Sequence, residues 1–229
     1  MAKKKQIEIE EEETSKTKQH KEADLILLFN LNRIAEYQTP LLKEWLDVTP
    51  PEFTAFETEL FTKKLKEAQN KLIGWSEEDL KMKFISDIIK LGYLEDGNGI
   101  VTFFDKQISA TVEGTLLTVK ADFMMARGLL NVLKNPYFHF QEYKPQINPK
   151  GEPMAQLLEA FMIAQVKNKT KKMPLYGVET IGKQWNFVIM EDKEYCISKS
   201  FDCTDKDDLL KIIAMLRKFR WILETRLMK

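Results

Sequence analysis

The spacing of the apolar side chains changes along this chain directly after Gly92. Up to that glycine they recur every three or four residues, which is the period of a helix with one buried face. Beyond it they alternate at every second residue and include many β-branched and aromatic side chains, which is typical of strands. A chain with both periods cannot be a simple helix bundle or an all-β domain, so it must pack helices against a sheet.

The residues before Gly92 predict only helices. A hydroxyl group stands at two expected helix starts, Thr49 before a pair of prolines and Ser76 before an acidic turn, where it can cap free backbone N–H groups. The predicted helices cover residues 23–40, 41–46, 50–72 and 77–91.

The residues after Gly92 predict strands interrupted by two helices. Turn residues separate the strands, and Pro153 opens an almost entirely apolar helix. The predicted strands cover residues 100–104, 107–112, 115–126, 137–144, 174–181, 184–190 and 194–198, and the predicted helices cover residues 154–167 and 205–227. We therefore expect an α/β (α+β) fold with one mixed sheet flanked by helices.

The length of 229 residues suits one large domain or two small ones. Residues 1–21 carry a lysine run, an acidic run and too few apolar side chains to offset the entropy of ordering, so they predict a mobile charged tail. Residues 22–74 predict an all-helical N-terminal region, and residues 75–229 predict the α/β core.

Charge and cysteine content exclude several kinds of protein. The 35 basic and 35 acidic side chains cancel, so no overall positive field draws the chain to nucleic acid, and any such site must be local. No apolar run reaches the roughly 18 residues of a membrane span. The two cysteines are too few for a disulfide framework or a zinc site, and we expect a protein of the reducing cytoplasm.

Charged residues on the predicted strands are the strongest candidates for chemistry, because the chain has no Gly-rich phosphate loop, paired-histidine metal motif or serine elbow. Strand alternation places Glu142 and Lys144 on one face with Phe138 and Phe140, so an apolar face ends abruptly in charge. Together with Asp122 from the preceding strand, two carboxylates at a sheet edge can hold a divalent ion, and the lysine can orient a water molecule. This layout suits hydrolysis of a phosphodiester.

A plainer interpretation of the same residues stays open. Glu-x-Lys is a weak motif, and the same spacing recurs at Glu191 and Lys193 in a predicted turn. Asp122 shares its predicted strand face with Lys120 and Thr118, which is typical of a solvated surface.

The order of these features resembles that of a known family. A helix beginning Ser76-Glu77-Glu78-Asp79 is followed by a hairpin strand with Asp122, by Glu142-Tyr143-Lys144, and by a helix beginning Ala155-Gln156-Leu157-Leu158. This order resembles the restriction-endonuclease-like PD-(D/E)XK nucleases, whose core is αβββαβ. It is similar in particular to the branch related to the N-terminal nuclease domain of type I restriction subunits. The resemblance covers the chain from Trp75 to the C-terminus.

The resemblance implies a metal-dependent nuclease. By position, Asp122 and Glu142 would bind Mg²⁺ or Mn²⁺, and Lys144 would be the catalytic lysine. The main-chain carbonyl of Tyr143 would be a further metal ligand. The chain departs from the family pattern at Ala121, where the family name expects proline.

Two helical residues are also matched by position. Glu77 matches an acidic residue that many members carry early in the first core helix, with Glu78 as the competing choice. Gln156 matches a glutamine that points towards the active site from the helix after the lysine strand. Each has a plainer alternative, because acidic residues favour the positive end of a helix dipole and a buried amide can simply bond nearby backbone.

Two basic groups are candidates for contact with nucleic acid, although charge runs are usually solvated faces. The first is Lys167, Lys169, Lys171 and Lys172, and the second is Arg217, Lys218, Arg220 and Arg226. We expect DNA as the substrate and leave RNA open. The alternative function is a non-catalytic nucleic-acid-binding or protein-interaction module, which would bind a partner protein or a second copy through its N-terminal helices.

Overall fold

The computed structural model describes residues 20–34 and 39–228. Most of the predicted charged tail therefore lies outside the described residues. His20 and Lys21, its last two residues, lie against the folded chain: His20 Nδ1 is 2.6 Å from the Glu159 carboxylate, and the Lys21 N–H donates to Asp24 Oδ2 at 3.0 Å.

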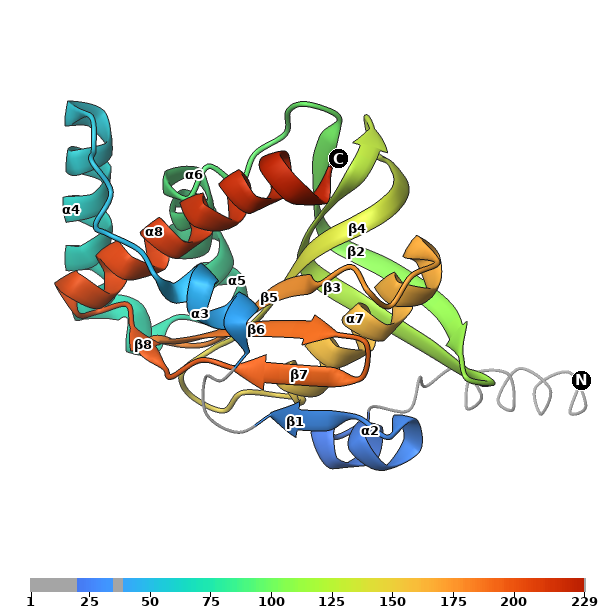
Figure 1. The fold of residues 1–229 in the computed structure, drawn as a ribbon. Helices are drawn as coiled ribbons and strands as arrows, with labels where there is room; N and C mark the ends of the chain where they lie inside the picture. The colour runs from blue at the N-terminus through green and yellow to red at the C-terminus, as the bar shows by residue number, and fades with distance from the viewer. Residues whose placement is uncertain (1–19, 35–38, 229) are drawn as a thin grey trace, which may run out of the picture.

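Helices lie on both sides of a central group of strands (Figure 1). The α-helices are α2 (Glu22–Phe29), α3 (Pro40–Leu46), α4 (Ala55–Lys71), α5 (Glu77–Leu80), α6 (Ser86–Leu91), α7 (Pro153–Asn168) and α8 (Lys206–Ile222). A 3₁₀ turn, η1 (Leu72–Gly74), follows α4. The described residues also contain two π-helical turns, η2 (Lys81–Ile85) between α5 and α6, and η3 (Leu223–Leu227) after α8.

The strands form one mixed eight-stranded sheet. They are β1 (Asn32–Ile34), β2 (Ile100–Val112), β3 (Thr115–Leu129), β4 (Val132–Lys144), β5 (Leu175–Ile181), β6 (Gln184–Glu191), β7 (Glu194–Ile197) and β8 (Phe201–Asp202). Their order is β1-β7-β6-β5-β4-β3-β2, with β8 paired to β6. The pairs β1–β7 and β4–β5 are parallel, and the other described pairs are antiparallel. The predicted mixed α/β class is therefore confirmed.

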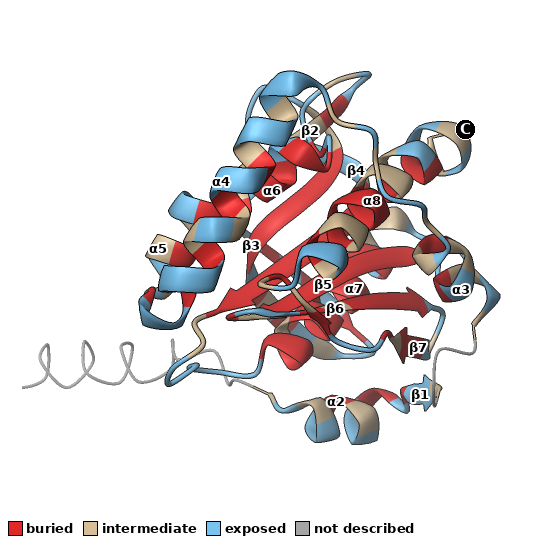
Figure 2. Cartoon of the chain, turned by 90° about the vertical axis from the view of Figure 1, so that its left-hand side faces the viewer, coloured by how far each residue is buried: buried red, intermediate tan, exposed pale blue. Residues whose placement is uncertain are grey.

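Two apolar clusters hold helices to the sheet, whose strands are largely buried (Figure 2). One cluster joins the sheet to α3, α4, α6 and α8, and includes Trp45 and Phe219. The other joins it to α2 and α7, and includes Phe140 and Phe161. The predicted apolar helix α7 is buried along nearly its whole length, from Pro153 to Gln165.

The N-terminal region is not all helical, contrary to the expectation. The first helix stops early because Asn30 adopts a left-handed conformation (φ 52°), and the following residues form β1, which pairs in parallel with β7. The long helix α4 also begins later than the Thr49 signal predicts. Thr54 caps it instead, because its side chain accepts the Glu57 N–H while the Glu57 carboxylate accepts the Thr54 N–H.

The predicted boundary between an N-terminal region and a core stays a prediction. Side chains on both sides of residue 75 pack in one cluster, since Leu42, Trp45 and Phe61 join Phe219 there. The N-terminal helices therefore contribute directly to the burial of the sheet.

An irregularity in β4 changes one predicted strand face. The β3–β4 register shifts just after the pair Met125 and His139, so the next pair skips Phe138. A skipped residue bulges and resets the alternation. Phe138 therefore packs in the cluster on the α8 side and Phe140 in the cluster on the α7 side, and the two do not share a face as predicted. Glu142, two residues further on, keeps the face of Phe140.

Within the described part of the chain, no helix is both long and apolar enough to cross a membrane. Cys196 and Cys203 are free and buried. Burial raises the pKa of the Cys203 thiol above its usual range, so this thiol stays protonated and packs as an apolar group.

Candidate active site

Asp122 and Glu142 lie at the end of the ladder between β3 and β4. The last pair of this ladder is Phe123 and Gln141, so Asp122 and Glu142 are the next residues of the two strands. The negative charge of Asp122 lies close enough to Glu142 to raise its pKa. Where the ladder ends, Asp122 Oδ2 accepts the Tyr143 N–H at 2.8 Å. The two predicted carboxylates are therefore neighbours.

Glu142 is the least satisfied charge of this group. Its side chain is 0% exposed, and no described residue makes a hydrogen bond of good geometry to either carboxylate oxygen, although the Asp122 backbone N–H lies close enough to favour the charged form. Burial raises the pKa of Glu142 well above its ordinary value, and the negative charge of Asp122 raises it further, against the positive charges of Lys144 and Lys81 and the backbone N–H of Asp122. A buried polar group without a partner costs about 1–3 kcal/mol or more, so the fold keeps this carboxylate at the expense of stability.

Lys144 and Glu77 approach each other from a strand and a helix. Lys144 is the last residue of β4 and is only 6% exposed, and its Nζ lies 3.3 Å from Glu77 Oε2. Glu77 is the first residue of α5, which starts there because the Ser76 side chain accepts the Asp79 N–H at 3.1 Å. Glu78, the competing choice, is exposed. Glu77 is therefore the acidic residue that this helix brings to Lys144.

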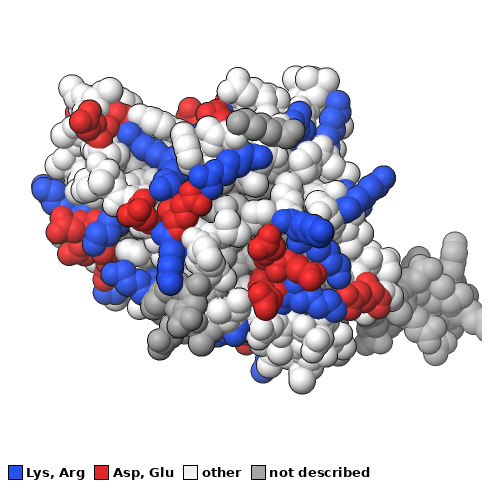
Figure 3. All heavy atoms as spheres, viewed as in Figure 1, with Lys and Arg blue, Asp and Glu red and all other residues white. Residues whose placement is uncertain are grey.

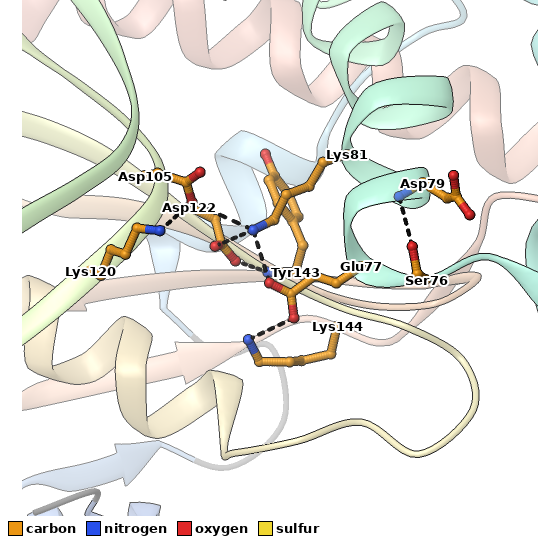
Figure 4. A network of polar contacts seen from close by, with 9 residues as sticks. All are labelled: Ser76, Glu77, Asp79, Lys81, Asp105, Lys120, Asp122, Tyr143 and Lys144. Carbon is orange, nitrogen blue, oxygen red and sulfur yellow. Dashed lines mark hydrogen bonds and ion pairs between the residues drawn. The ribbon is translucent and has the colours of Figure 1, made fainter. Parts of the chain in front are cut away.

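A second lysine, Lys81, lies in the middle of the network (Figure 4). Its Nζ is 2.6 Å from Asp122 Oδ1, 2.9 Å from Glu77 Oε1 and 3.6 Å from Asp105 Oδ1. Burial opposes the charge of this lysine, but the hydrogen bonds that it donates to Asp122 and Glu77 outweigh the effect of burial and raise the pKa of Lys81 above its usual value. Burial likewise opposes the charge of Glu77, but Lys81 and Lys144 outweigh it and lower the pKa of Glu77. Lys81 and Glu77 are therefore both charged at neutral pH.

Sequence reasoning missed Lys81, Asp105 and Glu179. Lys81 stands four residues after Glu77, which is the spacing of an ion pair on one helix and is visible in the sequence. Asp105 lies in the gap between two predicted strands that are one continuous strand, β2, and it has a left-handed conformation (φ 50°). Glu179 is in register with Glu142 across the parallel pair β4–β5, and burial raises its pKa.

The donor atoms of this group suit a hard divalent ion such as Mg²⁺ or Mn²⁺, which prefers carboxylate and carbonyl oxygens. The unpartnered Glu142 carboxylate is a group that such an ion would satisfy. Within residues 20–34 and 39–228, no three His, Cys, Asp or Glu side chains form a metal-binding group. A metal would therefore depend on the Asp122 and Glu142 carboxylates, with the Tyr143 carbonyl and water as further ligands.

Gln156 belongs to a different hollow of the molecule. This cavity has a volume of about 310 Å³ and is lined by His20, Lys21, Gly151, Glu152, Gln156 and Glu159. None of these residues comes from β3 or β4. Gln156 Oε1 is buried and has no hydrogen-bond partner in the described chain, so no hydrogen bond links it to the carboxylate site.

The predicted lysine contacts lie at the far end of α7 from the site. The loop after Lys144 leads into the N-terminal end of α7, whereas the lysine run begins in its last turn. A 16-residue helix is about 24 Å long, so the two groups are well separated. On the face seen in Figure 3, basic side chains are interspersed with acidic ones. Lys171, for example, lies 3.3 Å from Glu113.

The predicted basic residues of α8 and η3 are engaged within the fold. Each contacts a carboxylate or a main-chain carbonyl: Arg217 binds Glu57, Lys218 binds the Asp47 carbonyl, Arg220 binds Glu224 and the Glu95 carbonyl, and Arg226 binds Glu44. Their first role is therefore to hold helices together.

The chain was compared with protein families, curated proteins and solved structures. A scan against protein families finds no match, and a search of curated proteins finds none either. Among solved structures, the chain is similar to one in a cryo-electron microscopy structure of a DrdV–DNA complex, with 12% sequence identity and a TM-score of 0.36. The match covers 72% of this chain and 14% of that chain.

Proposed function

We propose that this chain is a divalent-metal-dependent phosphodiesterase of the restriction-endonuclease-like class, with DNA as the expected substrate and RNA as the second choice. The observation that carries the proposal is the Glu142 carboxylate, which is fully buried, lacks a hydrogen bond of good geometry and lies close to Asp122 just beyond the last ladder pair. The element order from α5 through three antiparallel strands, α7 and β5 supports the class, because it is αβββαβ.

In the proposed reaction, Asp122 and Glu142 would hold a Mg²⁺ or Mn²⁺ ion. Such an ion would polarise the scissile phosphate and acidify the attacking water. Lys144 positions that water for in-line attack and stabilises the negative charge that develops on the phosphate. Glu77, with its Oε2 at 3.3 Å from Lys144 Nζ, aligns the lysine.

The test combines metal binding with cleavage. We expect Mn²⁺ to bind the full chain in calorimetry and to support cleavage of double-stranded DNA. Glu142→Gln and Lys144→Met should each lower the cleavage rate by at least about 10²-fold, the usual cost of removing one group that stabilises transition-state charge.

The chain offers a matched control with the same spacing. Glu191 and Lys193 repeat the Glu-x-Lys pattern at the turn between β6 and β7, and Glu191 is exposed. Glu191→Gln and Lys193→Met should leave both metal binding and cleavage unchanged. Full activity of Glu142→Gln in the presence of metal would refute the proposed site.

A second candidate, a non-catalytic module on the same fold, is favoured by one observation. The Lys81 ammonium lies 2.6 Å from Asp122, so this carboxylate already has a counter-charge without any metal. Such a module would bind no Mn²⁺ and would act through a partner protein, a second copy or nucleic acid. The cytoplasmic location stays a prediction for either candidate.

A further inference from the structure

We propose that Lys81 is a resident counter-cation, which a divalent metal must displace from Asp122 before the site can load. This inference rests on the proposed function, because it concerns the same carboxylates. It assigns Lys81 a role in controlling metal affinity, which is separate from the catalytic role proposed for Lys144.

Lys81 holds one of the two carboxylate oxygens of Asp122. Asp122 Oδ2 accepts the Tyr143 N–H at 2.8 Å, and its Oδ1 is bound by Lys81 Nζ at 2.6 Å. Both Asp122 oxygens therefore have a donor, and Oδ1 is the one held by a cation. An ammonium and a metal ion cannot both sit against that oxygen, because their like charges repel strongly at such distances in a partly buried site.

Lys81 does not neutralise Glu142, the other carboxylate that would bind the metal. Lys81 binds Asp122 and Glu77, but it makes no hydrogen bond to Glu142, whose two oxygens have no partner in the described chain. A single ammonium therefore satisfies only part of the group. A divalent ion brings twice the charge and can bind Asp122 and Glu142 together, which gives the metal the advantage over the lysine.

The Lys81 side chain can move away from Asp122 towards solvent. Its side chain is 20% exposed, against 8% for Lys144, so it has a route to solvent on a flexible four-carbon stem. Asp105, whose side chain is 53% exposed, lies 3.6 Å away and offers the displaced ammonium another partner nearer the surface. Lys81 is also the first residue of the π-helical turn η2, and single π-turns inside helices occur frequently at functional sites.

Metal binding to variants of the full chain tests the displacement. In calorimetric titrations with Mn²⁺, Lys81→Met should bind at least about tenfold more tightly than the unmodified chain, because no charge-assisted hydrogen bond has to be broken first. Lys81→Gln, which keeps a polar donor without the charge, should shift the affinity in the same direction. The matched control is Lys83→Met on the same helix, whose ammonium pairs with Asp79 at 2.6 Å on the surface and whose loss should leave Mn²⁺ affinity unchanged.

A second measurement uses the unmodified protein and does not depend on the folding of a variant. Acetylation of individual lysines by acetic anhydride, followed by mass spectrometry, reports how freely each ammonium loses its proton and meets the reagent. Saturating Mn²⁺ should raise the rate at Lys81 several-fold, because the metal frees it from Asp122. The rate at Lys83 should stay constant.

The outcomes separate this inference from the proposed function. If Mn²⁺ binds the unmodified chain and Glu142→Gln abolishes binding, the proposed site stands. Should Lys81→Met then bind no more tightly and Lys81 labelling stay constant, the displacement inference is wrong. Binding to Lys81→Met alone would support Lys81 as the barrier and refute a metal-dependent activity of the unmodified chain. If no variant binds Mn²⁺, both ideas fail.

Discussion

Among the described residues, Lys64 and Lys81 each bind more than one carboxylate, and their surroundings differ in one respect. Lys64 Nζ lies 2.9 Å from both Glu67 and Asp87 and donates to the Lys83 carbonyl at 2.7 Å, so its three N–H donors all have partners. Burial opposes the charge of Lys64, but these bonds outweigh it and raise the pKa of Lys64. We call Lys64, Glu67 and Asp87 the Lys64 cluster.

The second group, which we call the Lys81 cluster, consists of Lys81, Glu77, Asp122, Glu142 and Lys144. It contains the same kinds of ion pair, but Glu142 keeps two buried oxygens without a partner. A cluster whose charges are all paired needs no ligand and serves to join helices. A cluster that leaves one carboxylate unpaired is less stable than it could be, which is typical of a site shaped for a ligand. The unpaired charge, and not burial as such, therefore distinguishes a candidate site from a structural ion pair.

The largest expected effect comes from breaking the balanced cluster. Lys64→Met should lower the free energy of unfolding by about 3 kcal/mol, at the lower end for a broken buried pair because the Glu67 side chain is 26% exposed. Urea unfolding measures this loss. Mn²⁺ should not restore the lost stability, and restoration by Mn²⁺ would contradict the distinction between the two clusters.

The next effect has the opposite sign. Glu142→Gln should raise the free energy of unfolding at pH 8 by about 2 kcal/mol, because it removes a buried carboxylate that lacks a partner, and this corresponds to about 5 °C in Tm for a chain of this size. The pKa of Glu142 is raised in the fold, so the wild-type chain loses stability as the pH rises above the ordinary carboxyl range.

The pH dependence provides the check on that prediction. The advantage of Glu142→Gln should grow from pH 5 to pH 8 and vanish near pH 4, where the carboxyl is protonated in both the folded and the unfolded chain. Glu191→Gln, at the exposed end of β6, should give no such trend. A Glu142→Gln variant that is less stable than the wild type at pH 8 would show that the carboxylate is satisfied in solution.

The smallest effect at neutral pH, which grows only on acidification, tests burial without an unpaired charge. His139 is 0% exposed and stacks on Phe219 with ring centroids 4.5 Å apart, and burial lowers the pKa of His139 to about 3. The unfolded chain takes up a proton near pH 6.5 and the folded chain does not. The contribution of His139 is therefore present above pH 6.5 and is lost as the pH falls towards 3, at about 1.4 kcal/mol for each pH unit.

Comparison with His139→Gln isolates this contribution, because the amide does not titrate in this range. The slope of unfolding free energy against pH should differ between the two proteins by about 1.4 kcal/mol per pH unit between pH 6 and pH 4. Equal slopes would mean that His139 is protonated in the folded chain.

Local sequence signals predicted most of the elements. The Ser76 cap and Gly92 bracket the helical stretch that contains α5, η2 and α6, and alternation of apolar residues predicted β3, β5 and β6 to within a few residues. The predicted start of α4 was wrong because Thr54 and Glu57 form a capping box after the Thr49 signal. The predicted end of α2 was wrong because Asn30 takes a left-handed conformation. Short strands such as β1 were missed because their hydrogen bonds come from a distant strand.

The sequence by itself determined the mixed α/β class and, through strand alternation, named Asp122, Glu142 and Lys144 as the charged residues of interest, since periodicity and spacing depend on near neighbours. Glu77 was named through the resemblance to a nuclease family. Only the tertiary structure decided which of these charges meet. The register that brings Asp122 close to Glu142, and the helix that carries Lys81 onto Asp122, join residues 20 and 41 positions apart. Pairing over such distances is set by the packing of helices on the sheet. The unpartnered carboxylate of Glu142 is a property of the packed chain, because only burial removes the water that would satisfy it.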